Sequence, residues 1–510
     1  MTPRIPDLNL SVIVPLGFVA LGSMAVLLGE VFLSRRETFL GRRLSENWIG
    51  SLLGLGSIFF LALACWVSLV AFGIGATEEF DPGNPIFQLD PFSALLSAVV
   101  CFASLLSCAL AIDYLGEVRI NHGEYYALLL LSTAGMLLMI STVDLLGVFL
   151  GLELMSIPIY VLAGFDRRKL RSNESAMKYF LIGSFASAIM LYGMALLYGA
   201  SGSTAFEALR AGFGAHPTLA TIGIGLVLVG FAFKVSAAPF HQWTPDVYEG
   251  APSAVTAFMS VTVKATAFAA LIRLIGLGVG PLDAPLQNVL WVLAALTMLV
   301  GNLMAVIQSN VKRLLAYSAI GHAGYLLLGV LTGTPESYGA VVFYLIAYVF
   351  MNLGAFGVVV ALAHRGHDCD RIDSFAGLAR LRPGLAGLMT LFMLSLAGIP
   401  GTVGFIAKFT VFSAAVRADF IWLTILAVLT SVVSVYYYLR IPVLMYMREP
   451  GDEKPRMEIS SGEAVVLVVC ALAVLFLGIF PNHALLPLVG DVQVLDWSRD
   501  SVRLLFRAAG

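Results

Sequence analysis

Residues 228–252 read LVGFAFKVSAAPFHQWTPDVYEGAP, an apolar run that carries Lys234 and is then interrupted by Pro239, Pro245 and Pro252. A charged side chain at the centre of a bilayer costs about 2.5–3.5 kcal/mol on insertion scales. Proline removes a backbone donor from a helix. Freed backbone groups at membrane depth are tolerated only where they are buried in protein or line a wet cavity. This stretch therefore predicts a discontinuous helix inside a membrane protein.

The composition of the whole chain supports the same class. The 510 residues are 59% hydrophobic and only 12% charged, and the mean hydropathy is +0.91. Soluble domains are about a quarter charged. The net charge of −2 also gives no field that would attract polyanions. These values exclude a soluble enzyme, a disordered protein and a nucleic-acid binder, and they indicate an all-α polytopic membrane protein.

The sequence offers no site for a redox cofactor or a nucleotide. Its cysteines are scattered and form no CxxC pair or haem motif: Cys65, Cys101, Cys108, Cys369 and Cys470. Rossmann and P-loop fingerprints are also missing. We therefore expect neither a bound cofactor nor a metal, and we expect any redox cofactor to lie on a partner chain.

Apolar runs between charged or Pro/Gly-rich breaks predict fourteen membrane spans. They are 10–33, 48–75, 91–113, 124–141, 143–164, 175–199, 219–240, 252–275, 286–308, 312–331, 338–363, 384–414, 420–447 and 461–480. The first run is long enough to remain as a span rather than to serve as a cleavable signal. The tail after residue 480 is too polar to span and ends in a short amphipathic segment.

The distribution of Lys and Arg predicts the orientation of these spans. Loops after odd-numbered spans carry eighteen of these cations, and loops after even-numbered spans carry two, Arg210 and Arg417. The positive-inside rule therefore places the odd loops in the cytoplasm and both termini outside, as in the plasma membrane of a prokaryote. Arg273 and Arg440 lie near span ends, where we expect them to extend toward the interface.

A small set of titratable residues falls inside the apolar spans: Glu153, Lys178, Lys234, Lys264, His322 and Lys408. One reading makes them structural, as ion pairs, as interface-seeking side chains or, for the histidine, as a hydrogen bond between packed helices. The other reading makes them proton carriers, because burial without a partner anion disfavours the charged form of an amine. One deep carboxylate cannot pair with several deep lysines, which favours the second reading.

A second break and a weak repeat extend this pattern. Gly398, Pro400, Gly401 and Gly404 precede Lys408, which predicts that the twelfth span is broken as well as the seventh. An offset of 174 residues relates Lys234 to Lys408 and Lys178 to Asn352. We therefore expect a three-helix segment at 1–123 and two inverted five-helix repeats at 124–275 and 286–447. The last span and the tail follow at 448–510.

The loop HRGHDCDRID contains several potential metal ligands: His364, His367, Asp368, Cys369 and Asp370. Their spacing matches no zinc pattern. We interpret the segment as a solvated interhelical loop.

Five motifs make the sequence resemble a known family. They are RSNESAMKYFLIGSFASAIMLYG (171–193), FKVSAAPFHQWTPDVYEGAPS (233–253), GNLMAVIQSNVKRLLAYSAIGHAGYLLLG (301–329), MLSLAGIPGTVGFIAKF (393–409) and SVVSVYYYLR (431–440). The sequence is similar to the antiporter-like subunit N (subunit 2) family of proton-pumping NADH:quinone oxidoreductase, respiratory complex I, and its photosynthetic relatives. The match runs from the fourth to the thirteenth span, and the first three spans and the tail match only in pattern.

The resemblance implies fourteen helices with inverted five-helix repeats and broken helices 7 and 12. It implies that Glu153 pairs with Lys234 and that Lys264 is the lysine that connects the two parts of the proton path. It also implies that Lys408 faces the exit half-channel for protons. Lys178 and His322 correspond to family positions on helices 6 and 10. The implied function is proton translocation coupled to quinone reduction elsewhere in the complex. The implied partners are neighbouring membrane subunits and the chains that carry NADH, FMN, iron–sulfur clusters and quinone.

Three other functions remain open on the sequence alone. Subunits of multisubunit cation/proton antiporters resemble this family at the same lysines. The membrane arm of a related hydrogenase is a further alternative. In the third, the chain is a structural membrane subunit whose lysines only hold helices together.

Overall fold

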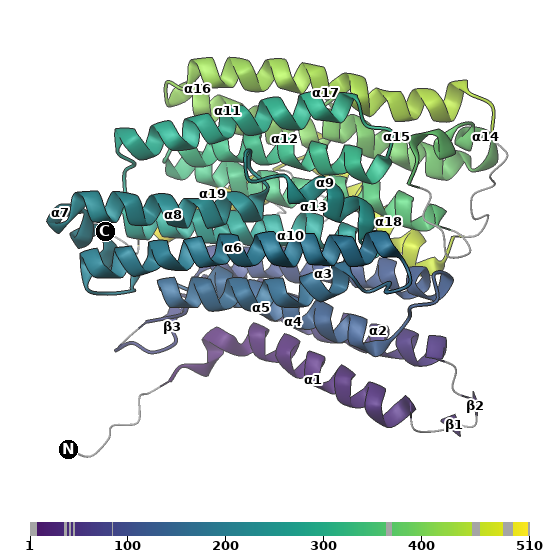
Figure 1. Cartoon of the computed structure of the whole chain (residues 1–510), viewed down its shortest axis with the longest axis horizontal. Coiled ribbons are helices and arrows are strands. Elements are labelled where there is room, and N and C mark those ends of the chain that lie inside the picture. Colours follow the sequence, from purple (N-terminus) through teal and green to yellow (C-terminus); the bar gives the residue numbers. More distant parts are fainter. Residues whose placement is uncertain are drawn as a thin grey trace.

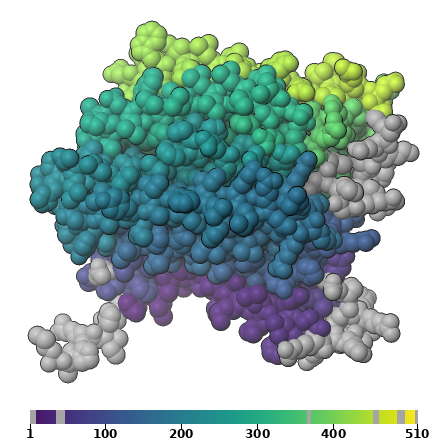
Figure 2. All heavy atoms as spheres, viewed as in Figure 1, coloured from purple at the N-terminus to yellow at the C-terminus, as the bar shows by residue number. Residues whose placement is uncertain are grey.

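A computed structural model describes residues 8–34, 38–39, 42–43, 46–83, 85–363, 370–450, 459–482 and 493–507. Long helices lie side by side along one direction (Figure 1). The sequence crosses the visible face in successive bands, from the N-terminal helices at one edge to the C-terminal half at the other (Figure 2). The observed architecture confirms the predicted all-α class.

The N-terminal part has three long helices and two short hairpins. Its elements are η1 (Leu10–Ile13), α1 (Val14–Ser34), β1 (Thr38–Phe39), β2 (Arg42–Arg43), α2 (Glu46–Gly73), β3 (Glu78–Glu79), β4 (Gln88–Leu89) and α3 (Pro91–Glu117). β1 pairs with β2 and β3 with β4, both antiparallel. Asp90 begins α3 with a capping box to Ser93, which satisfies orphan N–H groups at that helix end.

The next part contains the first predicted break. Its elements are α4 (Gly123–Ser141), α5 (Leu145–Ala163), α6 (Leu170–Ser201), α7 (Phe206–Ala215), α8 (Pro217–Val235), α9 (Trp243–Gly250), α10 (Ser253–Arg273) and the π-helix η2 (Leu274–Val279). The seventh predicted span is therefore the helix α8, followed by a break and the short helix α9.

The C-terminal part contains the second break. Its elements are α11 (Ala284–Val306), α12 (Val311–Leu331), α13 (Pro335–Leu362), η3 (Ile372–Phe375), α14 (Leu378–Leu381), α15 (Pro383–Ala397), α16 (Val403–Arg417), α17 (Ile421–Met447), α18 (Ser461–Ile479) and α19 (Val494–Arg507). The predicted amphipathic tail is the helix α19, whose Phe506 stacks on Tyr338 of α13.

Thirteen helices in the described part of the chain are long and apolar enough to cross a membrane. They match thirteen of the fourteen predicted spans. The remaining span, 384–414, is divided between α15 and α16, each of 15 residues, and neither is long enough to cross alone. The fourteenth crossing and the inverted relation of the repeats stay predictions.

Specific groups satisfy the backbone that the first break frees. Ser236 ends α8 in the left-handed conformation, at φ 64° and ψ 38°. The Trp243 indole donates to the carbonyl of Phe233, and its ring stacks on Tyr179 of α6 at 4.2 Å. The Thr244 hydroxyl donates to the Ser236 hydroxyl at 2.8 Å. The break is therefore a built feature rather than a frayed helix end.

The core of the bundle is formed by α10, α12 and α13. Every residue in the apolar windows of α10 and α12 is buried, and 94% of the α13 window is buried. By contrast, only about a third of the α1 and α2 windows is buried. α13 packs against α10, α12 and α16. The three central helices therefore contact protein on all sides, and two of them carry the predicted site residues Lys264 and His322.

The ends of the bundle follow the alternation that the charge pattern predicts. In Figure 1, β1, β2 and α14 lie at one end, and β3 and α7 lie at the other. α14 holds Arg380, from an odd loop, and α7 holds Arg210, from an even loop. The two classes of loop therefore lie at opposite ends, while the side of the membrane that each faces stays a prediction.

The expectation that Arg273 extends toward the interface is wrong. Its side chain is fully buried, and Nη2 lies 2.9 Å from Oδ1 and 2.7 Å from Oδ2 of Asp90. The guanidinium also lies over the Phe92 ring. A partner 183 residues away in the chain thus retains the arginine inside the fold. Arg440 is part-buried and donates to the Gln308 carbonyl.

Replacing Asp90 should show how much the buried Asp90–Arg273 ion pair stabilises the fold. Asp90→Ser keeps a helix cap but leaves the guanidinium unpaired, so we expect a loss of about 3–5 kcal/mol of unfolding free energy. The double variant Asp90→Ser with Arg273→Met should recover most of the loss. Thermal unfolding of the detergent-solubilised protein measures both. Equal midpoints for Asp90→Ser and the wild type would contradict a stabilising pair.

Candidate functional site

Lys234 lies in the last turn of α8, where the break begins. Its amine donates to the Ser156 hydroxyl at 2.7 Å and to the Tyr160 hydroxyl at 3.2 Å, both on α5. The rings of Tyr160, Tyr179 and Phe233 surround it, with centroids 5.3–5.7 Å from Nζ. Aromatic faces and hydroxyls stabilise an ammonium without a carboxylate in contact. The site can therefore hold the proton in the absence of a direct ion pair.

Glu153 lies on the same face of α5, one turn before Ser156 and two turns before Tyr160. Its Oε1 atom is buried and accepts no hydrogen bond from any residue that the structure describes. Among the described residues no ion pair within 4 Å joins Glu153 to Lys234, whose amine bonds to hydroxyls instead. The direct Glu153–Lys234 pair that the resemblance implies is thus replaced by hydroxyl contacts in this structure, because Ser156 and Tyr160 take up the amine.

Lys264 lies on the buried helix α10, and only 2% of its surface is exposed. Its amine donates to the backbone carbonyl of Ala319 on α12. His322 follows one turn later on α12. The histidine is likewise 2% exposed. The Lys264 amine of α10 therefore lies against the segment of α12 that carries His322.

His322 joins α12 to two other helices. Its Nδ1 atom contacts the Tyr344 hydroxyl of α13, and its Nε2 atom lies 3.1 Å from the Tyr438 hydroxyl of α17. The Tyr438 hydroxyl also contacts the Ser318 hydroxyl. Hydroxyl and imidazole groups both donate and accept hydrogen bonds. This network is thus chemically able to pass a proton.

Lys408 is the sixth residue of α16, which begins after the second break. Its amine donates to the Ala397 carbonyl and to the Ser431 hydroxyl, each at 2.9 Å. The Tyr325 ring lies 5.3 Å from Nζ. Ala397 is the last residue of α15, so the break supplies one acceptor for the lysine. Gly398 has a φ of 86°, a left-handed conformation that favours glycine, and a Cβ there would lie 3.0 Å from the Lys408 side chain.

A hollow of about 690 Å³ lies beside Lys408 between α15, α16 and α17. Its lining is mostly apolar, from residues such as Phe405, Phe409 and Val432, with the Ser431 hydroxyl among few polar groups. The amine thus lies at the boundary between the polar interior and the outer face of the bundle.

The structure brings five of the six predicted groups into one series across the bundle: Glu153, Lys234, Lys264, His322 and Lys408. Each is placed by a different helix, α5, α8, α10, α12 or α16. Hydrogen bonds join Lys234 to α5 and Lys264 to α12. Since α10 also packs against α8, and α12 against α16, neighbours in the series lie on helices in contact.

Lys178 does not join this series. Its side chain is 40% exposed, and Nζ lies 2.7 Å from Glu174 and 2.8 Å from Asp246. Asp246, on α9, also lies 2.7 Å from Arg313 of α12. Arg313 in turn contacts Glu249 at 2.9 Å. We call Lys178, Glu174, Asp246, Glu249 and Arg313 the ion-pair cluster; it ties α9 to α6 and to α12.

Asp246 lies on α9, outside the thirteen candidate spans, whereas its partners Lys178 and Arg313 lie near the ends of spans. Although burial alone would raise the pKa of this carboxyl, hydrogen bonds from Lys178 and Arg313 hold it below its ordinary value. A hollow of about 160 Å³ adjoins the cluster. The structural reading of Lys178, left open by the sequence, therefore describes its contacts better than a place in the buried series.

Sequence reasoning missed the uncharged members of the site. Ser156, Tyr160, Tyr344, Ser431 and Tyr438 hold the buried amines and the imidazole, and none stood out from the many Ser and Tyr residues of the spans. Tyr438 lies inside the quoted motif SVVSVYYYLR, so a signal was present. In the loop that resembles a metal site, residues 364–369 lie outside the described residues. The Asp370 carboxylate accepts from Asn310.

Comparison with known proteins identifies a family model and curated relatives. The model described as NADH:quinone oxidoreductase/Mrp antiporter, TM, matches residues 141–434. The chain is 42% identical to NADH-quinone oxidoreductase subunit N of Trichlorobacter lovleyi, with 98% of each chain covered. It is 43% identical to NADH-quinone oxidoreductase subunit N 1 of Sorangium cellulosum, with 92% of this chain and 96% of the relative covered.

Solved structures give the same fold. A chain of respiratory complex I from Thermus thermophilus is 35% identical, with a TM-score of 0.77, and the match covers 92% of this chain and 97% of that one. A chain of the Mrp complex from Dietzia reaches a TM-score of 0.84 at 24% identity, with 98% of both chains covered. The second likeness concerns the fold alone.

Asp246→Asn should loosen the ion-pair cluster. We expect a loss of roughly 0.5–2 kcal/mol of unfolding free energy, because two part-exposed ion pairs disappear. The pKa of Asp246 is lower in the folded state than the ordinary value, so its contribution is present above that value and is lost as the pH falls through the folded pKa. The difference from wild type should therefore close below about pH 4.

Thermal unfolding between pH 7 and pH 3 measures this difference. Asp373→Asn is the matched control, since Asp373 is exposed and lies 3.8 Å from its partner Arg371. A difference for Asp246→Asn that persists unchanged at pH 3 would contradict the assignment.

Proposed function

The chain belongs to the NADH-quinone oxidoreductase subunit N family, and from that membership we propose that it couples quinone reduction elsewhere in a membrane complex to proton translocation. The proton relay that we propose consists of Glu153, Lys234, Lys264, His322 and Lys408. The observation that carries it is that each cation in the series is held by hydroxyl or carbonyl oxygens or by aromatic faces, and none by a carboxylate in contact.

The switch at the start of the relay is the carboxylate of Glu153. In one state Lys234 rests on Ser156 and Tyr160, as described above; in the other it pairs directly with Glu153, one helical turn away on the same face of α5. Approach of the carboxylate stabilises the ammonium, and its withdrawal releases the proton toward the centre of the bundle. Coupling to quinone reduction consists of a neighbouring subunit moving this charge.

The magnitudes permit such a switch. Moving one charge against 100 mV requires about 2.3 kcal/mol. Removing one partner of a buried ion pair changes the free energy by about 3–5 kcal/mol. A change in the Glu153–Lys234 contact is therefore large enough to drive one proton through the relay.

The central part of the relay passes from Lys264 to His322 along α12. The Ala319 carbonyl holds the lysine amine, and the histidine ring continues the path to Tyr438. Lys408 then receives the proton at the second break. Because Ala397 and Ser431 accept from its amine without a charge, withdrawal of the proton leaves no unpaired anion behind.

We assign a different part to Lys178. The sequence alone predicts that Lys178 belongs to the relay. Its ion pairs with two carboxylates and its exposure support a structural role in the ion-pair cluster instead.

The wider setting follows from the same membership. We propose that the chain catalyses no redox reaction by itself and binds no redox cofactor, and that NADH, FMN, iron–sulfur clusters and quinone belong to partner subunits. Other membrane subunits contact it in the lipid bilayer. The charge pattern supports a prokaryotic inner membrane with both termini outside.

A cation/proton antiporter is the second candidate function, because the matching family model includes that class. The full-length identity of about 42% to subunit N sequences supports the first candidate. Exchange of Na⁺ for protons by the isolated chain in proteoliposomes would favour the second.

Two substitutions at Lys234 test the relay. Lys234→Ala should lower proton uptake and coupled electron transfer by about 10²–10⁴-fold, the usual contribution of a positioned proton carrier. Lys234→Arg retains the charge but cannot release its proton. It should therefore fail as well. Membrane vesicles containing the assembled complex give both rates, with subunit content checked by blotting.

Lys178→Ala is the control for the loss of a lysine near the same helices, and it should retain pumping. If Lys234→Arg pumps like the wild type in a fully assembled complex, the lysine has an electrostatic or structural part, and the relay is wrong.

Tyr438→Phe tests the central part of the relay. It removes the hydroxyl between His322 and Ser318 but preserves the ring packing. We expect slower proton uptake with normal assembly. Tyr437→Phe is the neighbouring control, because that hydroxyl donates to Asn302 and not to the histidine. Equal proton uptake in Tyr438→Phe and the wild type would exclude the tyrosine from the path.

A further inference from the structure

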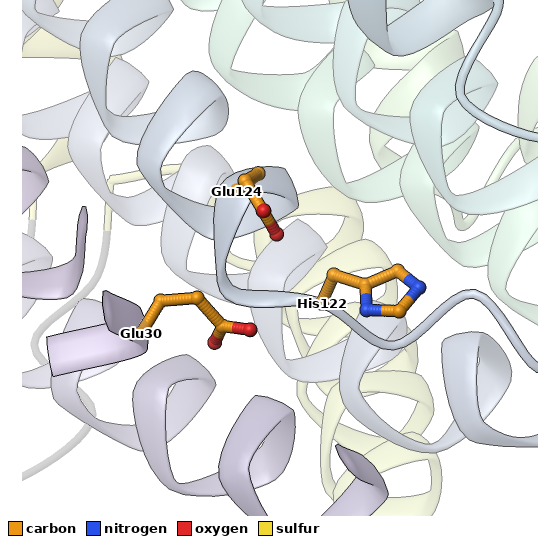
Figure 3. Close-up of side chains that lie close together, drawn as sticks. All are labelled: Glu30, His122 and Glu124. Atoms are coloured by element: carbon orange, nitrogen blue, oxygen red, sulfur yellow. The ribbon is translucent and has the colours of Figure 1, made fainter. Parts of the chain in front are cut away.

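A second cluster of ionisable side chains lies apart from the proposed relay, between the end of α1 and the start of α4. Glu30, His122 and Glu124 point toward one another, and one ligand atom from each lies within 4.8 Å of the other two (Figure 3). Glu30 comes from α1, His122 precedes α4, and Glu124 lies in the first turn of α4. Two carboxylates and an imidazole thus converge from two helices.

The imidazole of His122 is not used for helix capping. The residue is the N-cap of α4 with an extended backbone, at φ −121° and ψ 149°, and its side chain makes no cap hydrogen bond. Among the described residues we find no hydrogen-bond partner for its ring. One ring nitrogen faces the two carboxylates (Figure 3). The ring therefore offers a nitrogen ligand on the side where the carboxylates meet.

The residue between the two ligands of α4 is a glycine for a steric reason. A Cβ at Gly123 would lie 2.5 Å from Oε2 of Glu30 and 2.6 Å from Leu53. The backbone there is not in the left-handed region, so the conformation does not require glycine. A side chain there would instead force the Glu30 carboxylate to move, and the same oxygen accepts from the Gly123 amide at 3.2 Å. The local sequence is thus built to admit the carboxylate of α1.

We propose that Glu30, His122 and Glu124 form a binding site for a divalent transition-metal ion of the zinc type. Imidazole and carboxylate are ordinary ligands of Zn²⁺, and three protein ligands leave one position for water. Mg²⁺ and Ca²⁺ prefer oxygen ligands alone, so the imidazole selects against them. The start of α4 carries about half a positive charge, which the two carboxylates outweigh.

The bound ion would connect α1, a peripheral helix, to the first repeat. α1 packs against α4 along the bundle, but only about a third of its apolar window is buried. A metal bridge at one end therefore restrains a helix that has little other burial. This site shares no residue with the relay, so it stands or falls independently of the proposed function.

Zinc stoichiometry of the purified complex tests the proposal. Equilibrium dialysis against radioactive Zn²⁺ after chelator treatment gives the number of ions bound per complex. Gly123→Ala retains all three ligands but displaces Glu30, so it should bind one ion fewer than the wild type. Glu124→Gln, at an exposed position, should lose the same ion without affecting the fold.

Gly56→Ala is the matched control, because a Cβ at that position meets nothing within 4 Å. It should bind as many ions as the wild type. If Gly123→Ala and Glu124→Gln also match the wild type, the proposal is overturned.

Histidine labelling with diethyl pyrocarbonate gives a local readout in the same complex. Zn²⁺ should protect His122 and leave His216 reactive, since His216 is also a helix N-cap without a cap hydrogen bond but belongs to no such cluster. Mg²⁺ at the same concentration should protect neither. Equal protection by Mg²⁺ would show an unselective acidic surface and would overturn the assignment of a transition-metal site.

Discussion

The rest of this structure depends on how it keeps several ammonium groups inside an apolar bundle without giving each one a carboxylate. A single charge at mid-membrane is expensive, and a complete ion pair would hold its proton firmly. The chain uses weaker partners instead: two hydroxyls and three rings around Lys234, a carbonyl at Lys264, and a carbonyl with a hydroxyl at Lys408. Such partners stabilise a charge enough for folding while leaving the proton free to move.

The broken helices follow from the same constraint. A carbonyl inside an intact α-helix already accepts from its own backbone N–H, whereas a helix end leaves carbonyls with no intrahelical donor. The break after α15 frees the Ala397 carbonyl for Lys408. The break after α8 places Lys234 at a helix end, where the Trp243 indole donates to the freed Phe233 carbonyl. Full burial of α10 and α12 then keeps Lys264 and His322 away from lipid.

Much of the fold could be predicted from the sequence because membrane spans and helix breakers are local signals. The two breaks and the deep charges at Glu153, Lys234 and Lys408 are visible as departures from apolar runs. Partners that are distant in the chain are not visible in this way. Arg273 was expected to reach the interface because nothing local reveals Asp90, and Lys178 was placed in the relay because its contact with Asp246 forms only when α9 packs on α6. Uncharged partners such as Ser156 and Tyr160 do not stand out among the other Ser and Tyr residues of the spans, and Tyr438 is marked only by the motif SVVSVYYYLR.

The central claim is that the buried amines belong to one continuous proton path across the bundle. The most direct measurement is a structure of the assembled complex at a resolution that reveals ordered water. The account predicts waters that connect Lys234 with Lys264 and His322 with Lys408. Dry apolar packing across both gaps, with no bridging water in any conformation of the complex, would contradict it.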